Sequence, residues 1–244
     1  MSHEKGPTAY DGRELEAMDF AVNYHRWILS WFRPFLGKRI VEVGAGKGSF
    51  SKLILEQPLE SLCLVEPSEK MYQVLCAQIA SAATAKIITY NALFGEVARE
   101  IKSKQQPDSI IYVNVLEHVA NDEAELGILC QCLEPGGRIF ILVPALQWLY
   151  GEFDRQLGHY RRYARRELCD KCERAGFKVL RSGYVDLIGI VPWWTKYRLL
   201  KSTSMQPRAV SFYDRLVIPL SRRLESLLTP PIGKNIVLVA ERKP

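Results

Sequence analysis

Three glycines spaced two residues apart after a short apolar strand constrain this chain more than any other feature. The strand pattern covers residues 39–43, and Gly44, Gly46 and Gly48 follow it directly. A helical pattern then begins and covers residues 49–56. Glycine lets the backbone turn sharply and approach a ligand closely, and a helix N-terminus offers free N–H groups. The segment therefore predicts a nucleotide-binding corner.

The spacing of the glycines separates two classes of nucleotide-binding protein. Dinucleotide-binding chains use Gly-x-Gly-x-x-Gly to hold a pyrophosphate. Here the order is Glu42-x-Gly44-x-Gly46-x-Gly48, with an acid two residues before the first glycine. An NAD-dependent oxidoreductase is therefore disfavoured, because the spacing differs and no pyrophosphate-binding pattern is present.

Four further strand patterns follow in a regular order. They cover residues 61–65, 86–90, 108–113 and 139–144. The second strand of the chain ends at Glu66, where an acid is placed to accept hydrogen bonds from ribose hydroxyls. The fifth strand follows a Pro135-Gly136-Gly137 turn.

In these segments, across residues 39–144, the chain resembles the class I S-adenosylmethionine-dependent methyltransferases. The resemblance implies an α/β fold with a Rossmann-like, seven-stranded, mostly parallel sheet, helices on both faces and an antiparallel last strand. It implies S-adenosyl-L-methionine as the cofactor. Asn91 departs from the acid that the family usually carries beside the adenine, but its side-chain oxygen can accept the same hydrogen bond. The cofactor-binding residues implied are Glu42, Gly44, Ala45, Gly46, Gly48, Glu66, Pro67, Asn91, Ala92, Asn114, Val115 and His118.

Three later motifs resemble the type 11 and type 12 methyltransferases. They are Gly158-His159-Tyr160-Arg161-Arg162-Tyr163, Pro192-Trp193-Trp194 and Pro230-Pro231-Ile232-Gly233. The resemblance implies methyl transfer to O or N of a small molecule, such as a sugar, a lipid-linked sugar or a secondary metabolite. A pericyclase-like or regulatory protein that binds the cofactor without methyl transfer stays open, because no essential catalytic residue can be identified.

Two histidines are candidates for catalysis. Methyl transfer from a sulfonium needs mainly proximity and orientation, and a general base helps only where the acceptor is a hydroxyl or a protonated amine. His159 lies in a polar loop expected on the substrate side, and His118 follows the fourth strand. The alternatives are a loop-anchoring hydrogen bond for His159 and a packing role for His118.

Four residues are predicted to contact the acceptor: Tyr160, Arg161, Trp193 and Trp194. Arg161 and its neighbour Arg162 suit an anionic acceptor such as a phosphate or carboxylate. They can equally pair with Glu152 or Asp154 nearby.

The chain divides into four parts. We expect a flexible N-terminus over residues 1–13 and a cofactor-binding core over residues 14–185, whose first helix (residues 14–33) covers the cofactor site. A long insertion over residues 186–233 separates the last two strands. We expect it to cap the substrate pocket, because long loops inside a compact domain are usually functional. The final core strand and tail occupy residues 234–244.

The net positive charge of the chain is concentrated in and next to the cap. The chain has a net charge of +6. Residues 195–234 hold eight basic and two acidic side chains, so they carry that whole excess. An apolar start and an amphipathic basic helix over residues 212–228 predict peripheral membrane contact through residues 187–230. The alternative is that Trp193 and Trp194 pack inside the cap and the arginines are solvated.

Other classes of site and partner are not expected. The six cysteines are expected to be free thiols, with no disulfide and no metal site, because their spacing does not place suitable pairs on one face. Nucleic-acid methylation is disfavoured because the charge excess is moderate and an Asn-Pro-Pro-Tyr-type motif is lacking. With no signal-peptide pattern or membrane-spanning run, we expect a soluble, cytoplasmic protein. The oligomeric state stays open.

Overall fold

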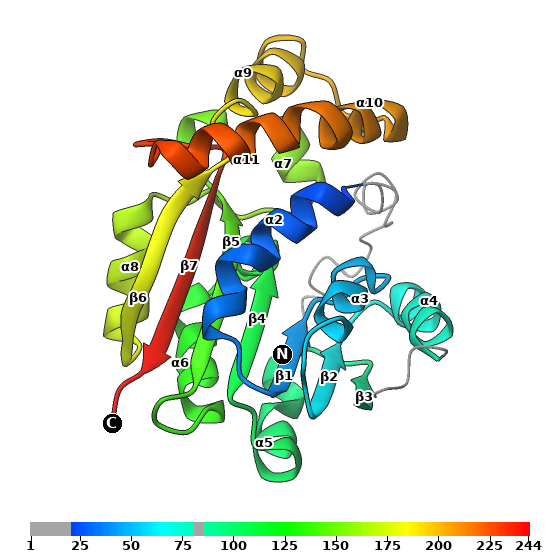
Figure 1. Ribbon diagram of the computed structural model, residues 1–244, viewed down its shortest axis with the longest axis vertical. Coiled ribbons are helices and arrows are strands. Elements are labelled where there is room, and N and C mark those ends of the chain that lie inside the picture. The colour runs from blue at the N-terminus through cyan, green and yellow to red at the C-terminus, as the bar shows by residue number, and fades with distance from the viewer. Residues whose placement is uncertain (1–20, 81–84) are drawn as a thin grey trace, which may run out of the picture.

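The computed structural model describes residues 21–80 and 85–244. At its centre is a seven-stranded sheet with the strand order β3-β2-β1-β4-β5-β7-β6 (Figure 1). The strands are β1 Arg39–Val43, β2 Ser61–Val65, β3 Lys86–Tyr90, β4 Ser109–Val113, β5 Arg138–Pro144, β6 Phe177–Val185 and β7 Asn235–Arg242. The pairs within β3-β2-β1-β4-β5 are parallel, whereas β7 runs antiparallel to β5 and β6. This confirms the mostly parallel sheet with an antiparallel last strand.

Helices cover both faces of the sheet. They are α2 Val22–Phe32, α3 Ser49–Leu55, α4 Glu69–Ile79, α5 Phe94–Gln105, α6 Asp122–Cys132, α7 Glu152–Gln156, α8 Arg165–Arg174, α9 Ile190–Trp193, α10 Pro207–Phe212 and α11 Ile218–Leu227. Short 3-10 turns are η1 Arg33–Phe35, η2 Leu116–His118 and η3 Gln147–Leu149, and two π-helical turns are η4 Trp194–Leu199 and η5 Tyr213–Val217.

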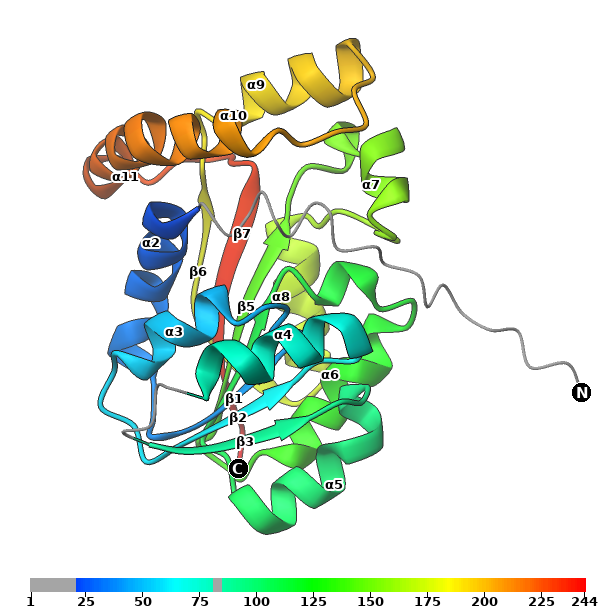
Figure 2. The ribbon, with the colours of Figure 1, turned by 90° about the vertical axis from the view of Figure 1, so that its right-hand side faces the viewer.

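The alternation of side chains along the strands divides the core in two. In β1, Val41 and Val43 pack on the face covered by α5, α6 and α8, whereas Ile40 packs on the face covered by α2, α3 and α4. Figures 1 and 2 show these two layers of helices on either side of the sheet. Because successive strand residues point to opposite faces, a strand covered on both sides is apolar throughout.

The cap, residues 186–233, lies over the carboxyl ends of the parallel strands (Figures 1 and 2). Its second half is one continuous helix over residues 207–227, formed by α10, η5 and α11. This confirms the expected helix, which begins at Pro207, five residues before the expected start at residue 212. None of the helices in the described residues is long and apolar enough to span a membrane.

Two expectations need comment. The segment that reads as a loop after β5 contains the short helix α7, because Asp154 accepts the backbone N–H of Gly151 at 2.9 Å and caps that turn. The expected flexible residues 1–13, and the part of the first helix before residue 21, lie outside the described residues.

All six cysteines are free.

Candidate active site

The glycine turn lies where the strand order reverses, between β1 and β4. Gly44, Gly46 and Gly48 have φ angles of 68°, 56° and 88°. Residues other than glycine rarely adopt this backbone region. A Cβ on Gly44 would lie 2.5 Å from Cγ2 of Val115, which follows β4. Crevices at such reversal points are the usual ligand sites of open α/β sheets. The turn can therefore pack this closely against Val115 only because Gly44 lacks a side chain.

Glu66 closes this turn from the end of β2. Its carboxylate accepts the backbone N–H of Gly46 at 2.8 Å and that of Ser68 at 2.9 Å. Burial raises the pKa of Glu66, although these two hydrogen bonds act in the opposite direction. Each carboxylate oxygen has a further lone pair. Glu66 is thus fixed in place and can still accept hydrogen bonds from a ligand.

The two following strands supply the neighbouring polar groups. The side-chain N–H of Asn91 donates to the backbone carbonyl of Glu66 at 2.9 Å, which leaves the amide oxygen available to an adenine amino group. Asn114 has a positive φ of 55°, and its N–H donates to the carbonyl of Leu142 at 2.9 Å. Ala92 is half-buried beside Asn91, and Pro67 is exposed beside Glu66.

Glu42 supports the corner from inside. It is buried in β1, and the hydroxyl of Ser51 on α3 donates to its carboxylate. Burial raises the pKa of Glu42 to about 8, the Ser51 hydrogen bond opposes that rise, and the nearby charge of Glu66 adds to it. Ala45 is also buried, and its N–H donates to the carbonyl of Val65 at 3.2 Å.

This arrangement fits S-adenosylmethionine. Gly44, Gly46 and Gly48 carry no side chains that would keep the amino-acid part of the cofactor from the backbone of the turn. The carboxylate of Glu66 could accept hydrogen bonds from the ribose, and the amide oxygen of Asn91 could accept one from the adenine. When bound, that cofactor supplies an activated methyl group on sulfur. Glu66, Asn91 and the glycine turn are the residues of this chain that would hold it.

That loop holds His159 against a buried ion pair. Nδ1 of His159 lies 3.2 Å from Oδ1 of Asp154. The same Asp154 accepts from Nε of Arg162 at 2.8 Å and lies 2.7 Å from its terminal nitrogen. Burial alone would raise the pKa of Asp154, but the His159 hydrogen bond and the Arg162 charge lower it. The ionised carboxylate only accepts hydrogen bonds, so Nδ1 of His159 carries the proton and Nε2 is left as a base.

Glu117 and His118, on η2 after β4, lie beside His159. The rings of His118 and His159 meet edge to face with centroids 4.6 Å apart. Burial lowers the pKa of His118 to about 3, so this ring is neutral at neutral pH. Burial raises the pKa of Glu117 to about 7, and neither carboxylate oxygen has a hydrogen-bond partner in the described part of the chain.

The same three residues have the geometry of a metal-binding group. One ligand atom each from Glu117, His118 and His159 lies within 4.8 Å of the others. Carboxylate oxygen and neutral imidazole nitrogen are ligands for several divalent metals. The spacing of the cysteines, from which no metal site is expected, carries no information on these three residues.

The four residues predicted to contact the acceptor differ in burial and in their partners. Trp193 is half-buried, and its ring lies 4.8 Å from the guanidinium carbon of Arg162. The indole N–H of Trp193 is buried and has no hydrogen-bond partner among the described residues. By contrast, Tyr160 and Trp194 are exposed, and Arg161 pairs with Asp122 at 3.0 Å. Trp193 thus lies against Arg162, which pairs with Asp154 beside His159. Acceptor contact by these four residues stays a prediction.

Three residues of this site are not among the sequence-based candidates. The sequence indicates Asp154 only as a possible partner of the neighbouring arginines, and nothing in it singles out Glu117. Lys234, directly before β7, pairs with Asp186 at 2.7 Å and lies 5.4 Å from the ring of Trp193. The partners of Asp154 lie within eight residues of it, whereas Glu117 and Lys234 lie beside residues from distant parts of the chain.

Comparison with known proteins agrees with the fold and the cofactor corner. Residues 19–182 match the methyltransferase domain family. A solved S-adenosylmethionine-dependent methyltransferase of Archaeoglobus fulgidus is 15% identical, with a TM-score of 0.57 over 96% of this chain and 100% of that chain. The [4+2]-cyclase SpnF is 14% identical, with a TM-score of 0.58 over 91% of this chain and 80% of that chain. At such identities the likeness shows the fold alone.

A curated relative matches over a shorter segment. The mitochondrial ubiquinone biosynthesis O-methyltransferase of Homo sapiens is 31% identical over 114 residues, which are 45% of this chain and 29% of that protein. The chain thus spans less than half the length of the curated relatives that it matches. Because the family model matches residues 19–182, more than half of the chain, the chain belongs to the methyltransferase domain family, whose class I members take S-adenosylmethionine as methyl donor.

Proposed function

We propose that this protein transfers the methyl group of S-adenosylmethionine to a hydroxyl oxygen of a small-molecule acceptor, with His159 as general base. The observation that carries the proposal is the contact between His159 Nδ1 and the buried Asp154. This contact orients the imidazole and leaves Nε2 to remove a proton from the acceptor. A neutral amine needs no such base before it attacks, so the dyad favours oxygen over nitrogen.

The surroundings of His159 favour an acceptor with apolar or aromatic character. Phe153, Trp193 and Tyr197 form a small aromatic cluster where α7 meets the cap, with the rings of Phe153 and Tyr197 stacked at 4.2 Å. The buried N–H of Trp193 offers a hydrogen bond to an acceptor oxygen. The match to O-methyltransferases named for ubiquinone biosynthesis supports an aromatic hydroxyl as the first acceptor to try. Sugars and other hydroxylated metabolites are further candidate acceptors.

The test combines a panel of acceptors with two histidine variants. Phenols, catechols, hydroxylated quinols, sugars and amines are offered with S-adenosylmethionine, and S-adenosylhomocysteine is quantified. His159→Ala should lower kcat by roughly 10²–10⁴, the usual contribution of a general base, with unchanged cofactor affinity. His118→Ala should lower kcat less. Reversed effects would assign the base to His118.

Two arms of the same assay separate the alternatives. If the cofactor binds by calorimetry but no acceptor yields S-adenosylhomocysteine, the protein uses this fold without methyl transfer. If EDTA abolishes turnover and a divalent metal restores it, the Glu117, His118 and His159 group deprotonates the acceptor through a metal instead of through His159 alone. Turnover that resists EDTA and falls in His159→Ala supports the proposal.

A further inference from the structure

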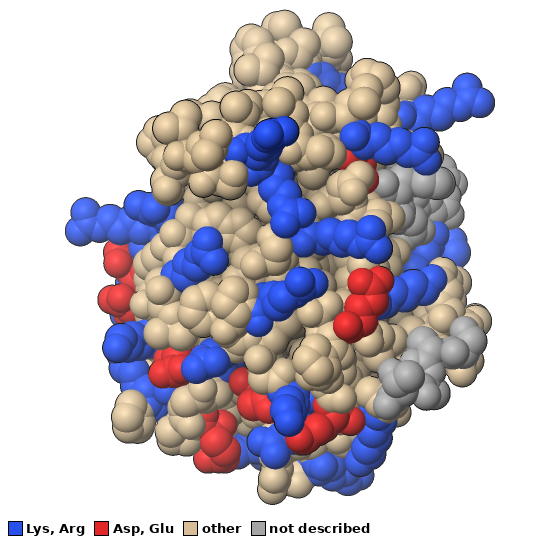
Figure 3. Space-filling model, in the orientation of Figure 1, with Lys and Arg blue, Asp and Glu red and all other residues tan. Residues whose placement is uncertain are grey.

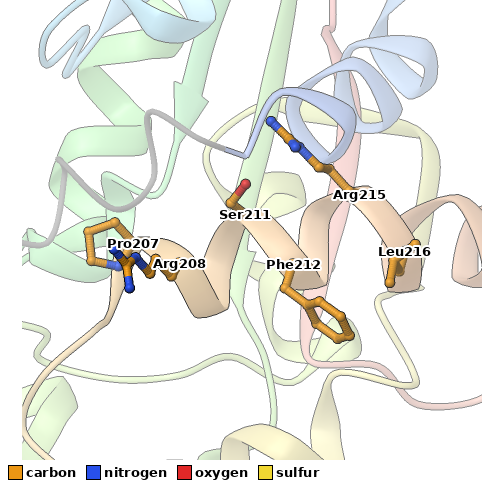
Figure 4. Close-up of a pocket in the computed structure, with 6 residues that line it drawn as sticks. All are labelled: Pro207, Arg208, Ser211, Phe212, Arg215 and Leu216. Carbon is orange, nitrogen blue, oxygen red and sulfur yellow. The ribbon is translucent and has the colours of Figure 1, made fainter.

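The long helix of the cap carries a stripe of exposed apolar side chains. The stripe consists of Phe212, Leu216, Leu220 and Leu224, each four residues after the last, and of Leu227 and Leu228 at the end. Their exposed fractions run from 45% at Leu224 to 78% at Leu227. Figure 4 shows Phe212 and Leu216 pointing away from α2, whereas Ser211 and Arg215 point toward the side on which α2 lies. A large contiguous apolar patch of this kind marks a contact with a membrane or a partner.

The opposite face of the helix already holds the cap on the core. Ile218 and Ser221 are buried. Asp214 accepts the backbone N–H of Asn23 at 2.9 Å and that of Tyr24 at 2.8 Å, at the start of α2. The hydroxyl of Tyr213 donates to Asp186 at 2.6 Å. The stripe therefore contributes nothing to seating the helix and is available to an external surface.

The charges around the stripe are of one sign. Six basic side chains are exposed on the cap: Arg198, Lys201, Arg208, Arg215, Arg222 and Arg223. None of the six forms an ion pair within residues 21–80 and 85–244. The two acids of residues 187–230 are used internally, since Asp214 caps α2 and Glu225 accepts the N–H groups of Asp186 and Leu187 at 3.2 and 2.8 Å. Figure 3 shows this end of the molecule as apolar and basic, with almost no acidic surface.

We propose that the cap docks on an anionic membrane surface, with the leucine stripe among the lipid headgroups and acyl-chain ends and the arginines against the phosphates. An amphipathic helix with an apolar face and basic flanks is the form that lies in the plane of such an interface. A second copy of this chain fits less well, because face-to-face contact would bring six unpaired cations of each copy together. A shallow hollow of about 530 Å³ between Pro207 and Leu216, lined also by Arg208 and Arg215, offers room for a headgroup.

Docking in this orientation would turn the cap toward the bilayer. The inference itself rests on the cap surface and not on the identity of the acceptor, so vesicle binding can be tested without any turnover.

The experiment is co-sedimentation of the full chain with vesicles, at low and at high salt. Vesicles of phosphatidylcholine alone are compared with vesicles that also contain phosphatidylglycerol. The apolar variant is L216Q/L220Q, and the charge variant is R222Q/R223Q. The matched controls are Leu93→Gln, an exposed leucine far along the chain from the cap, and Arg166→Gln, an exposed arginine on α8. Thermal melting and calorimetry with S-adenosylmethionine verify that each variant is folded.

We expect binding to the anionic vesicles at low salt, with at least a ten-fold loss in each cap variant and none in the controls. High salt should weaken binding, since each basic residue near an anionic surface contributes roughly five-fold. Equal binding to both vesicle types, no binding at low salt, or unchanged binding by L216Q/L220Q would overturn the proposal. So would a dimer in sedimentation velocity that L216Q/L220Q converts to a monomer while vesicles bind neither form. If the protein binds vesicles but transfers no methyl group to any acceptor, only the proposed function is refuted.

Discussion

Nδ1 of His159 lies 3.2 Å from Oδ1 of Asp154, whose carboxylate is fully buried and also holds Arg162. A buried carboxylate paired with an arginine stays ionised, so it accepts a proton-bearing nitrogen and fixes one tautomer of the imidazole. In the proposed function, the aspartate positions the histidine, and the histidine is the group that touches the acceptor.

Asp154→Asn should lower kcat by roughly 10²–10⁴, because an asparagine can donate to Nδ1 and favour the wrong tautomer. The affinity for S-adenosylmethionine should stay within two-fold, since Asp154 does not contact the cofactor corner. The pH–rate profile distinguishes positioning from loss of structure: the limb that reports the base should move or vanish. Asp170→Asn on α8 is the control, because Asp170 pairs with the exposed Arg166 only at 4.0 Å. A kcat within two-fold of wild type would remove Asp154 from the mechanism.

Glu66→Ala should weaken S-adenosylmethionine binding by about 1–3 kcal/mol, the cost of removing hydrogen bonds to a charged group. Isothermal titration calorimetry measures the change directly. Glu60→Ala is the matched control, because its carboxylate lies 3.8 Å from Lys38 in an exposed pair away from the glycine turn. Equal affinities in the two variants would contradict the assignment of Glu66 to the ribose.

Gly44→Ala should abolish cofactor binding, whereas Gly136→Ala should leave it intact. Both glycines have positive φ, 68° and 84°, so both variants carry the same kind of backbone strain of about 1–2 kcal/mol. Only at Gly44 would the new methyl group collide, at 2.5 Å from Cγ2 of Val115, whereas nothing lies within 4 Å at Gly136. Thermal melts should show a loss of stability in both variants and a larger one in Gly44→Ala. The idea fails if Gly44→Ala binds the cofactor normally.

Glu117→Gln should change how stability depends on pH. Burial raises the pKa of Glu117 from 4.5 to about 7, so between these values the folded state holds more protons than the unfolded state. The contribution of Glu117 to stability is therefore complete below the ordinary carboxyl pKa and is lost as pH rises through about 7. Because glutamine does not titrate, stability of the variant relative to wild type should rise with pH, by up to about 3 kcal/mol.

Thermal or urea unfolding at several pH values measures this difference. The raised pKa values of Glu42 and Glu225 act in both proteins and cancel in the comparison. Glu123→Gln is the control, because its carboxylate is exposed and pairs with Arg174 at 2.7 Å. A difference between wild type and Glu117→Gln that does not vary with pH would show that Glu117 titrates as an ordinary carboxyl.

The cofactor corner was predictable because its elements are local. A strand, three glycines and a helix are contiguous over residues 39–55, and Glu66 and Asn91 each follow directly from a strand whose apolar pattern is continuous. Parallel strands place their carboxyl ends at one edge of the sheet, so residues that follow them meet there whatever the details of packing. The antiparallel last strand was implied by the family resemblance alone, whereas the insertion before it was predicted from the order of the segments.

The catalytic side was decided by tertiary structure. Whether Arg161 or Arg162 pairs with Asp154, and whether Trp193 or Trp194 faces the site, depends on the turn around Gly158 and on the start of α9, where one residue's shift reverses a side chain's direction. His118 and His159 lie 41 residues apart in the sequence and meet only because η2 and the loop after α7 pack together. The sequence determined by itself the first five strands and the glycine turn, since both follow from short-range patterns. Only the tertiary structure decided how Glu117 and His118 meet His159, and which face of the cap is left exposed, because those depend on contacts between distant segments.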